Sequence, residues 1–213
     1  MGGKLFEELY ELLEGEKYGS NESCQRASVA GQSLRDRVYE EAIRQQKIAE
    51  NWARKNNCLI LDPNDYFDEI YGDSELMGSE AKVWYDSRRN LAIKNITLNH
   101  YPNLKALFDR ILIHNLAFSS TAMTPIGIGT SDEGISVIVE QPWIADSNEI
   151  PTFEEIDKYL TEKLNFTHSR GFGSNADYTK NEYLVTDLRP ENVIKQPNGD
   201  LAVIDCFAKF QSA

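Results

Sequence analysis

Three polar residues near the end of the chain have types and spacing that could bring oxygen atoms to one point. Asp187 and Asn192 lie five residues apart in one loop, so both side chains can face the same place. Two apolar strands joined by a turn at 197–199 then return the chain to Asp205. Carboxylate and amide oxygens are hard donors of the kind that a magnesium–phosphate complex needs. The spacing therefore predicts a site for chemistry on a phosphate group.

The segment 185–205, VTDLRPENVIKQPNGDLAVID, resembles the catalytic loop and the metal-binding aspartate of the protein-kinase family. The resemblance implies that Asp187 accepts or orients the proton of the attacking hydroxyl and that Asn192 and Asp205 hold Mg²⁺. Arg189 stands where the family usually has Lys, which implies a contact with the transferring phosphate. The alternative is a hairpin with an aspartate at each end that matches by chance. A match over six consecutive loop positions favours the resemblance.

A second and shorter match lies upstream. The run LAIK, which ends at Lys94, resembles the strand whose lysine contacts the α- and β-phosphates of ATP, and residues 78–83 resemble the end of the Gly-rich loop. Residues 140–144 fall where the family has its adenine-binding hinge. The resemblance implies that ATP is bound by five residues of this part of the chain, namely Gly78, Val83, Lys94, Glu140 and Pro142.

The chain also departs from the family's pattern. Ala81 and Leu76 replace two loop glycines, and Cys206 follows the second aspartate where the family has Phe. The helix expected at 103–118 has no Glu, so the usual partner of the strand lysine is missing. Asn115 lies on the apolar face of that helix and is a candidate neutral partner. These departures favour a divergent relative over a typical protein kinase.

Only eight residues follow Asp205, where a protein kinase has its activation segment and the helices of its substrate-binding floor. This length, together with the DLRPEN form of the loop, resembles the reduced kinase-like domains of polyvalent proteins from phages and mobile elements. The resemblance covers roughly residues 65–207. It implies an α+β fold of the protein-kinase type, with an antiparallel-sheet N-lobe, an abbreviated C-lobe and an N-terminal helical extension.

The pattern of apolar residues agrees with three regions, expected at 1–57, 58–144 and 145–213. Helical spacing of leucines predicts helices over 4–14, 33–55 and 103–118, and residues 16–32 read as a loop. Thr152 and Glu155 form a capping box that predicts a further helix. Short runs rich in β-branched and aromatic residues predict the strands. Residues 165–181 are expected to be irregular. The predicted strands are CLILD, YFDEIYG, KVWYD, NLAIKNI, 122–128, 135–141, 183–185, 193–194 and 201–204.

The charge and cysteine content limits the partners and the compartment. With 22 Lys and Arg against 34 Asp and Glu, the formal net charge is −12, which disfavours nucleic acid and anionic membranes as partners. Three scattered cysteines predict free thiols in a reducing compartment. Neither a signal peptide nor an apolar span of about 20 residues is apparent. We therefore expect a cytoplasmic protein.

Three functions fit these patterns. The first is an ATP- and Mg²⁺-dependent phosphotransferase that transfers the γ-phosphate to a hydroxyl acceptor, which includes a protein substrate. The second is a weakly active or inactive pseudokinase that binds a nucleotide or a partner protein, which the missing Glu and the depleted glycines favour. The third is a small-molecule kinase, although such families usually carry a His in the loop where this chain has Pro190 and Glu191.

Overall fold

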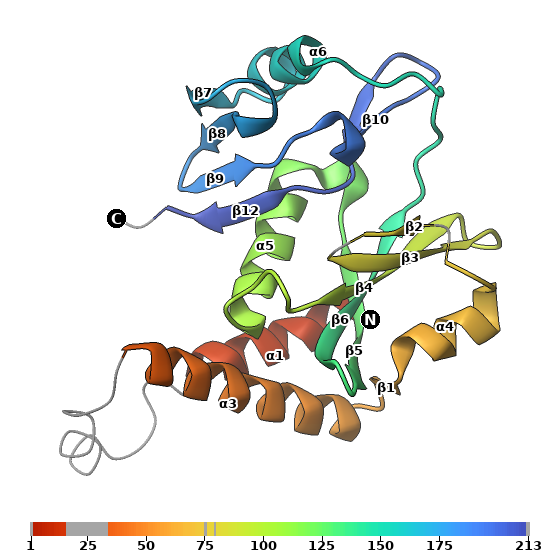
Figure 1. Cartoon of the computed structure of the whole chain (residues 1–213), viewed down its shortest axis with the longest axis vertical. Helices are drawn as coiled ribbons and strands as arrows, with labels where there is room; N and C mark the ends of the chain where they lie inside the picture. The colour runs from red at the N-terminus through yellow and green to blue at the C-terminus, as the bar shows by residue number, and fades with distance from the viewer. Residues whose placement is uncertain (1, 16–33, 75, 79, 212–213) are drawn as a thin grey trace. The chain divides into compact units, whose positions relative to one another are not determined.

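The computed structural model describes residues 2–15, 34–74, 76–78 and 80–211, which fall into two compact units (Figure 1). The first unit comprises Met1–Arg88, Ala92–Leu107 and Thr124–Glu140. The second unit comprises Arg89–Leu91, Phe108–Met123 and Gln141–Ala213. Each unit is thus made of several chain segments, and the boundaries expected at 57/58 and 144/145 stay a prediction.

A six-stranded sheet lies mainly in the first unit, with strand order β1-β5-β6-β4-β3-β2. Strand β1 runs parallel to β5, and β5 runs antiparallel to β6. The sheet is therefore mixed, and the expectation of a purely antiparallel sheet is wrong at β1. The strands are β1 (Leu59–Leu61), β2 (Leu76–Met77), β3 (Ala81–Asp86), β4 (Leu91–Thr97), β5 (Thr124–Ser131) and β6 (Gly134–Pro142).

Helix α4 (Pro63–Tyr71) occupies the YFDEIYG run that was predicted as a strand, so that prediction is wrong. Pro63 starts the helix, where its missing N–H costs nothing. Phe67 is buried one turn later, and its ring centroid lies 5.2 Å from that of Trp84 on β3. Asp68 accepts hydrogen bonds from the Trp84 indole and the Lys82 ammonium, each at 2.8 Å. Phe67 and Tyr71, one turn apart, stack with ring centroids 6.1 Å apart on one face of the helix, whereas Tyr66 is exposed.

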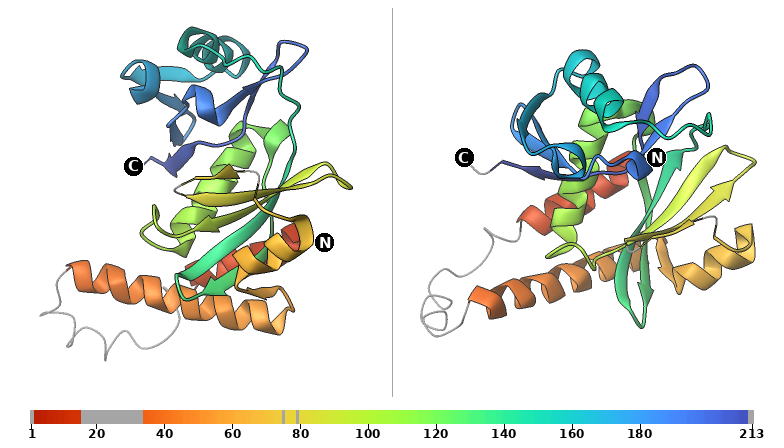
Figure 2. Two further views of the ribbon diagram at one scale, coloured as in Figure 1. Left: turned by 45° about the vertical axis from the view of Figure 1, so that its right-hand side comes forward. Right: turned by 45° about the horizontal axis from the view of Figure 1, so that its top comes forward.

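Two long helices, α1 (Gly2–Gly15) and α3 (Leu34–Lys55), confirm the helices predicted near the N-terminus. They contact each other and both contact β5 (Figure 2, red and orange). Leu9 and Leu13 are fully buried, and the Phe6 and Trp52 rings meet edge to face at 5.2 Å. The loop expected at 16–32 and the Ser33 cap lie outside the described residues.

The second unit contains a four-stranded antiparallel sheet with order β12-β9-β8-β7 and a separate hairpin of β10 and β11. Strands β7 and β8 lie in the segment 165–181, so the prediction of an irregular loop there is wrong. Strand β12 is an addition to the predicted elements. These strands are β7 (Thr167–Arg170), β8 (Asp177–Lys180), β9 (Tyr183–Thr186), β10 (Val193–Lys195), β11 (Leu201–Val203) and β12 (Phe207–Phe210).

Helix α6 (Phe153–Lys158) begins with the predicted capping box and continues as a π-helical turn over Tyr159–Lys163. Ile156 and Leu160 are buried in the core of the second unit, whereas Phe153 is exposed. Helix α5 (Leu104–Ala117) confirms the helix predicted at 103–118. Among the described residues, no helix is both long and apolar enough to span a membrane.

Candidate active site

The loop between β9 and β10 is closed by its own hydrogen bonds. Leu188 is buried and anchors the loop in the core of the second unit. Residues 190–192 form a 3₁₀ turn, in which the Asn192 N–H donates to the Arg189 carbonyl at 2.9 Å. The turn brings the side chains of Asp187 and Asn192 together, as the sequence predicted.

Asp187 adopts a left-handed backbone conformation with φ of +59°, which is uncommon for a residue with a side chain. The Asn192 amide holds this conformation, because its Nδ2 donates to the Asp187 carbonyl at 2.7 Å and to Asp187 Oδ2 at 3.1 Å. Backbone strain of this kind is often found at functional sites. Among the described residues, Asn192 Oδ1 has no hydrogen-bond partner and stays open to a ligand.

The carboxylate of Asp187 also forms an ion pair with Arg189. The Arg189 Nε lies 2.7 Å from Asp187 Oδ1. The two side chains are 48% and 43% exposed, so water and salt screen the pair and it contributes little to stability. Arg189 can therefore leave Asp187 at small cost when a stronger anion is present.

Asp205 reaches the same loop through the β10–β11 hairpin. Val193 pairs with Val203, and beyond this pair the Ile204 N–H donates to the Asn192 carbonyl at 2.9 Å. The Asp205 Oδ1 accepts the Cys206 N–H at 2.8 Å and also bonds a guanidinium N–H. No other described residue bonds the second oxygen, Oδ2.

The guanidinium beside Asp205 belongs to Arg110 on α5. Its side chain is only 1% exposed, and its Nε donates to the Cys206 carbonyl at 2.9 Å. Arg110 was not among the residues predicted for the site, because a single Arg within an amphipathic helix usually reaches solvent. The Asn115 amide, expected as a neutral partner for Lys94, exchanges two 2.7 Å hydrogen bonds with the Met123 backbone. Helix α5 thus contributes a cation to the site of the second unit.

The residues expected to bind ATP lie mostly in the first unit. Lys94 is buried on β4, and Gly78 closes the β2–β3 turn through a 3.0 Å hydrogen bond to Ala81. Val83 lies on β3, and Glu140 lies near the end of β6. Pro142, the last residue of β6, belongs to the second unit. Their roles toward ATP stay predictions.

The oxygens of Asn192 and Asp205 fit the donor set of Mg²⁺, which usually takes one or two protein oxygens and completes its shell with phosphates and water. Within the described residues there is no group of three or more His, Cys, Asp or Glu side chains arranged to hold a metal ion. The two oxygens would therefore hold Mg²⁺ together with a phosphate group and would not form a closed metal cage.

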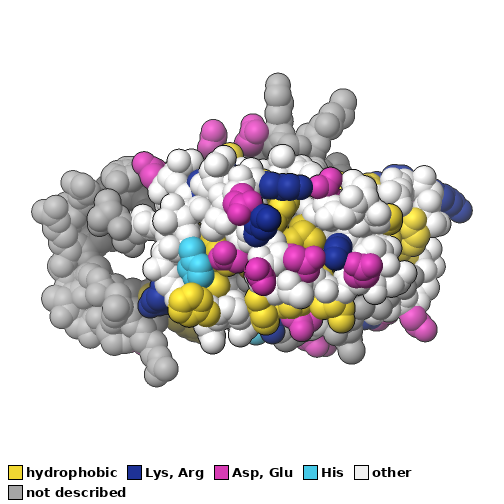
Figure 3. Space-filling model, turned by 90° about the horizontal axis from the view of Figure 1, so that it is seen from above, with side chains coloured by type: hydrophobic (Ala, Val, Ile, Leu, Met, Phe, Trp, Pro, Cys, Tyr) yellow, Lys and Arg dark blue, Asp and Glu magenta, His cyan; other side chains and the backbone are white. Residues whose placement is uncertain are grey.

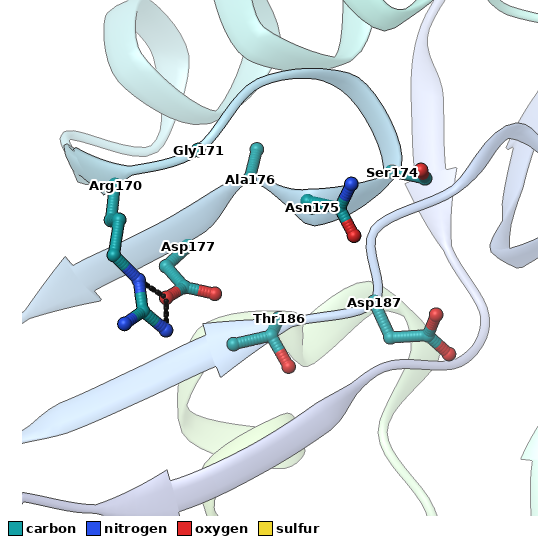
Figure 4. Close-up of a pocket in the computed structure, with 8 residues that line it drawn as sticks. All are labelled: Arg170, Gly171, Ser174, Asn175, Ala176, Asp177, Thr186 and Asp187. Atoms are coloured by element: carbon teal, nitrogen blue, oxygen red, sulfur yellow. Dashed lines mark hydrogen bonds and ion pairs between the residues drawn. The ribbon is translucent and has the colours of Figure 1, made fainter.

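A cavity of about 530 Å³ adjoins Asp187 within the second unit (Figure 4). It is lined by residues 170–171 and 174–177 of the β7–β8 hairpin and by Thr186 and Asp187 at the end of β9. The sequence of this hairpin lies within 165–181, which was predicted to be irregular. The structure instead places its loop at the wall of a cavity beside the candidate base.

Comparison with known proteins shows the family of the chain. No match was found among curated proteins. A protein-family profile, described as serine/threonine/tyrosine kinase found in polyvalent proteins, matches residues 42–212, about four fifths of the chain. The match includes all the residues expected in the site, from Gly78 to Asp205. The chain therefore belongs to the family of serine/threonine/tyrosine kinases found in polyvalent proteins.

Proposed function

We propose that the chain transfers the γ-phosphoryl group of ATP, as its Mg²⁺ complex, to a hydroxyl acceptor. One observation carries this proposal. The Asn192 amide is held through its nitrogen, which bonds Asp187, and Asp205 is held through Oδ1, so that among the described residues Asn192 Oδ1 and Asp205 Oδ2 have no partner. The Asp205 N–H donates to the Asn192 carbonyl at 3.4 Å, so the two residues are joined through the backbone. Phosphoryl transfer depends mainly on positioning and charge neutralisation, and fixed oxygen ligands next to a base supply the positioning.

Each of the proposed site residues in the second unit has a different role in the reaction. Asp187 orients the acceptor hydroxyl and takes up its proton. Asn192 and Asp205 would hold Mg²⁺, which neutralises charge on the phosphate oxygens when it is bound. Arg189 exchanges its screened ion pair with Asp187 for the transferring phosphate. Lys94 of the first unit contacts the α- and β-phosphates, and its sheet serves as the N-lobe of a reduced kinase fold.

A second candidate function is a pseudokinase that binds the nucleotide without transferring phosphate. The observation in its favour is that both carboxylate oxygens of Asp187 are engaged, Oδ1 by Arg189 and Oδ2 by Arg189 and Asn192. A carboxylate that is paired with a guanidinium is a weaker base, so Asp187 would act as a base more readily once Arg189 moves. Both functions include binding of the nucleotide, but only the phosphotransferase transfers the phosphoryl group.

Thermal unfolding with ATP, in the presence and absence of Mg²⁺, tests the nucleotide site. At a hundredfold excess over its dissociation constant, a ligand that binds only the folded state adds about 2.7 kcal/mol of stability. We expect this gain with Mg²⁺ in the wild type and its loss in Asn192→Ala and Asp205→Asn. Asp200→Asn changes an exposed carboxylate on the turn of the same hairpin and is the control. Equal stabilisation of all four proteins would contradict the proposed ligands.

Transfer from ATP labelled at the γ-phosphate separates the two functions. We expect phosphoryl transfer, or slow hydrolysis by water, in the wild type and loss of both in Asp187→Ala, while this variant still binds ATP. Full binding without transfer or hydrolysis in the wild type would support the pseudokinase. Activity that survives in Asp187→Ala would exclude Asp187 as the base.

A further inference from the structure

Two buried side chains hold the backbone that leads into Asp205. Thr121, in the 3₁₀ turn after α5, donates its hydroxyl to the Val203 carbonyl, its nearest acceptor, at 2.5 Å. Gln141, next to the end of β6, donates its amide to the Ile204 carbonyl at 3.1 Å. Both side chains are buried, so water cannot replace them as donors. The two carbonyls that precede Asp205 are therefore fixed from within the second unit.

The same two residues are bonded to each other and to the chain that follows Asp205. Gln141 Nε2 also donates to the Thr121 carbonyl, at 2.7 Å. This carbonyl lies 3.0 Å from His114 Nε2, so this ring nitrogen carries a proton. The other ring nitrogen, Nδ1, then accepts the proton of the Cys206 thiol, whose sulfur lies 3.6 Å away. Because Cys206 follows Asp205 directly, one buried network holds the backbone on both sides of the carboxylate.

Arg110 completes the arrangement at the carboxylate itself. Its Nε donates to the Cys206 carbonyl at 2.9 Å, and its Nη2 bonds Asp205 Oδ1. One carboxylate oxygen is thus held by a buried guanidinium, and the backbone that carries the side chain is held by Thr121 and Gln141. These donors come from three separate elements, namely α5, the 3₁₀ turn after it and β6. Together they determine the position of the remaining oxygen, Oδ2.

The members of this network are all hydrogen-bonded. In the part of the second unit that the structure describes, every buried side-chain nitrogen and oxygen has a partner. A buried network of this kind is rigid, because opening one bond leaves a desolvated group unpaired. The molecular face drawn in Figure 3 differs, since there Asp and Glu are interspersed with Lys and Arg in contact with solvent, which screens such pairs. Asp205 is therefore fixed by the interior of the unit and not by its surface charges.

We infer that Thr121 and Gln141 are positioning residues, which fix Asp205 Oδ2 and thereby give the site a preference for Mg²⁺ over Ca²⁺. The inference rests on the proposed function, in which Asn192 and Asp205 hold the ion that accompanies ATP. Mg²⁺ requires nearly octahedral ligands at about 2.0–2.1 Å, whereas Ca²⁺ accepts irregular shells with longer bonds. A fixed oxygen suits the stricter ion. Loosening the Asp205 backbone should therefore weaken the binding of Mg²⁺ more than that of Ca²⁺.

The test uses the full chain and the β,γ-imido analogue of ATP, which binds without turnover. Calorimetric titration measures the Kd of the analogue with Mg²⁺, with Ca²⁺ and without a metal ion. Thr121→Val and Gln141→Met each remove the donor and nearly keep the size of the side chain. In both we expect the Kd with Mg²⁺ to rise about tenfold, the Kd with Ca²⁺ to rise less than about threefold, and the Kd without metal to stay within about twofold. Thr121→Ser keeps the hydroxyl and should restore the wild-type values.

Tyr178→Phe is the matched control, because it removes a hydroxyl that donates to Asp157 Oδ1 at 2.9 Å within the same unit. It should change none of the three constants. Amide hydrogen exchange gives a second readout that needs no ligand. The Cys206 N–H, which donates to Asp205 Oδ1, should exchange faster in Thr121→Val and Gln141→Met and not in the control.

Circular dichroism checks folding, and where one of the two substitutions prevents folding, the other decides. If neither variant folds, Cys206→Ala decides, because it removes a smaller contact of the same network and should shift the constants in the same direction. Kd values with Mg²⁺ and Ca²⁺ that rise together, no rise with Mg²⁺, or unchanged exchange at Cys206 would overturn the inference. The same holds if Thr121→Ser behaves like Thr121→Val. A wild type that binds the analogue equally well with and without Mg²⁺, or does not bind it, refutes the proposed function itself.

Discussion

The guanidinium group of Arg110 is bonded to one carboxylate oxygen of Asp205 and leaves the other oxygen open. Arg110 is almost completely buried, whereas the Asp205 side chain is 29% exposed. A buried cation is costly unless an anion is fixed beside it, so the pair constrains both residues. Arg110 thus determines which Asp205 oxygen is presented toward the catalytic loop.

A double-mutant cycle tests this relationship. We expect Asp205→Asn to lower the free energy of unfolding by about 3 kcal/mol, because the buried guanidinium loses a carboxylate. Arg110→Met should cost less, because water can reach the partly exposed Asp205 that remains. The double variant should be more stable than the sum of the single effects, with a coupling of about 1–3 kcal/mol by urea unfolding. Additive effects would show that the pair does not act as a unit.

Arg189 is expected to matter for transfer and not for stability. Its ion pair with Asp187 is exposed, so Arg189→Ala should change the free energy of unfolding by less than about 0.5 kcal/mol. If Arg189 contacts the transferring phosphate, the same variant should lower kcat about 10- to 100-fold. Lys163→Ala, which removes an exposed ion pair with Asp200, is the control and should leave both unchanged. A kcat that rises in Arg189→Ala would mean that the arginine only blocks Asp187.

The capping box at the start of α6 predicts a pH-dependent contribution to stability. Hydrogen bonds from the Thr152 backbone N–H, the Lys195 ammonium and the Thr152 hydroxyl lower the pKa of Glu155 from 4.5 to about 2. Because the folded-state pKa is the lower one, the stabilisation is fully present above about pH 4.5 and is lost as the pH falls toward 2.

Thermal unfolding of the wild type and Glu155→Gln between pH 2 and pH 7 measures this contribution. We expect the wild type to be more stable by a constant amount near neutral pH and the difference to disappear near pH 2. Thr152→Ala removes the other half of the box and should cost about 1 kcal/mol at pH 7. A difference for Glu155→Gln that stays the same across the whole range would contradict the assigned pKa.

Gly129 on β5 tests the packing of α4 against the first sheet. A Cβ at this position would overlap the Ser136 Oγ on β6 and would lie 2.8 Å from the Cγ of Pro63, the first residue of the helix. We expect Gly129→Ala to lower the free energy of unfolding by about 1–3 kcal/mol through overpacking, measured by urea denaturation. Gly78→Ala is the control, because its Cβ would meet only the Ala81 carbonyl at 3.7 Å. Equal stabilities of the two variants would contradict the close packing of β5 against Ser136 and Pro63.

The catalytic-loop region could be predicted from sequence because its structure is determined locally. The 3₁₀ turn at 190–192 and the β10–β11 hairpin each depend on residues close in the chain, such as Pro190 and the turn at 197–199. The capping box of Thr152 and Glu155 is equally local and is confirmed. Spacing in the sequence was therefore sufficient to predict that Asn192 meets Asp187 and that the hairpin returns the chain to Asn192 at Asp205, while a common ligand of the three side chains stays a prediction.

Other features depend on contacts between distant segments. The α4 run is rich in aromatic residues, as strands are, and becomes a helix because Phe67 packs on Trp84 of another element. Strands β7 and β8 contain His, Asp and Lys, which favour strands weakly, and they are stabilised by pairing with β9. Arg110 meets Asp205 across 95 residues of sequence. No local pattern specifies such a pairing.

Strand β12 begins two residues after Asp205 and pairs with β9, with Phe207 opposite Thr186. The backbone on the other side of Asp205 leads directly from β11. Turning the Asp205 side chain would break its hydrogen bonds with the Cys206 N–H and the Arg110 guanidinium, and the buried guanidinium would lose its carboxylate. Moving the Asp205 backbone would in addition open the ladder between β12 and β9, which is a local unfolding event, and slow amide exchange at β12 would show that this opening is rare. Control of this protein by a moving aspartate would thus be energetically unfavourable.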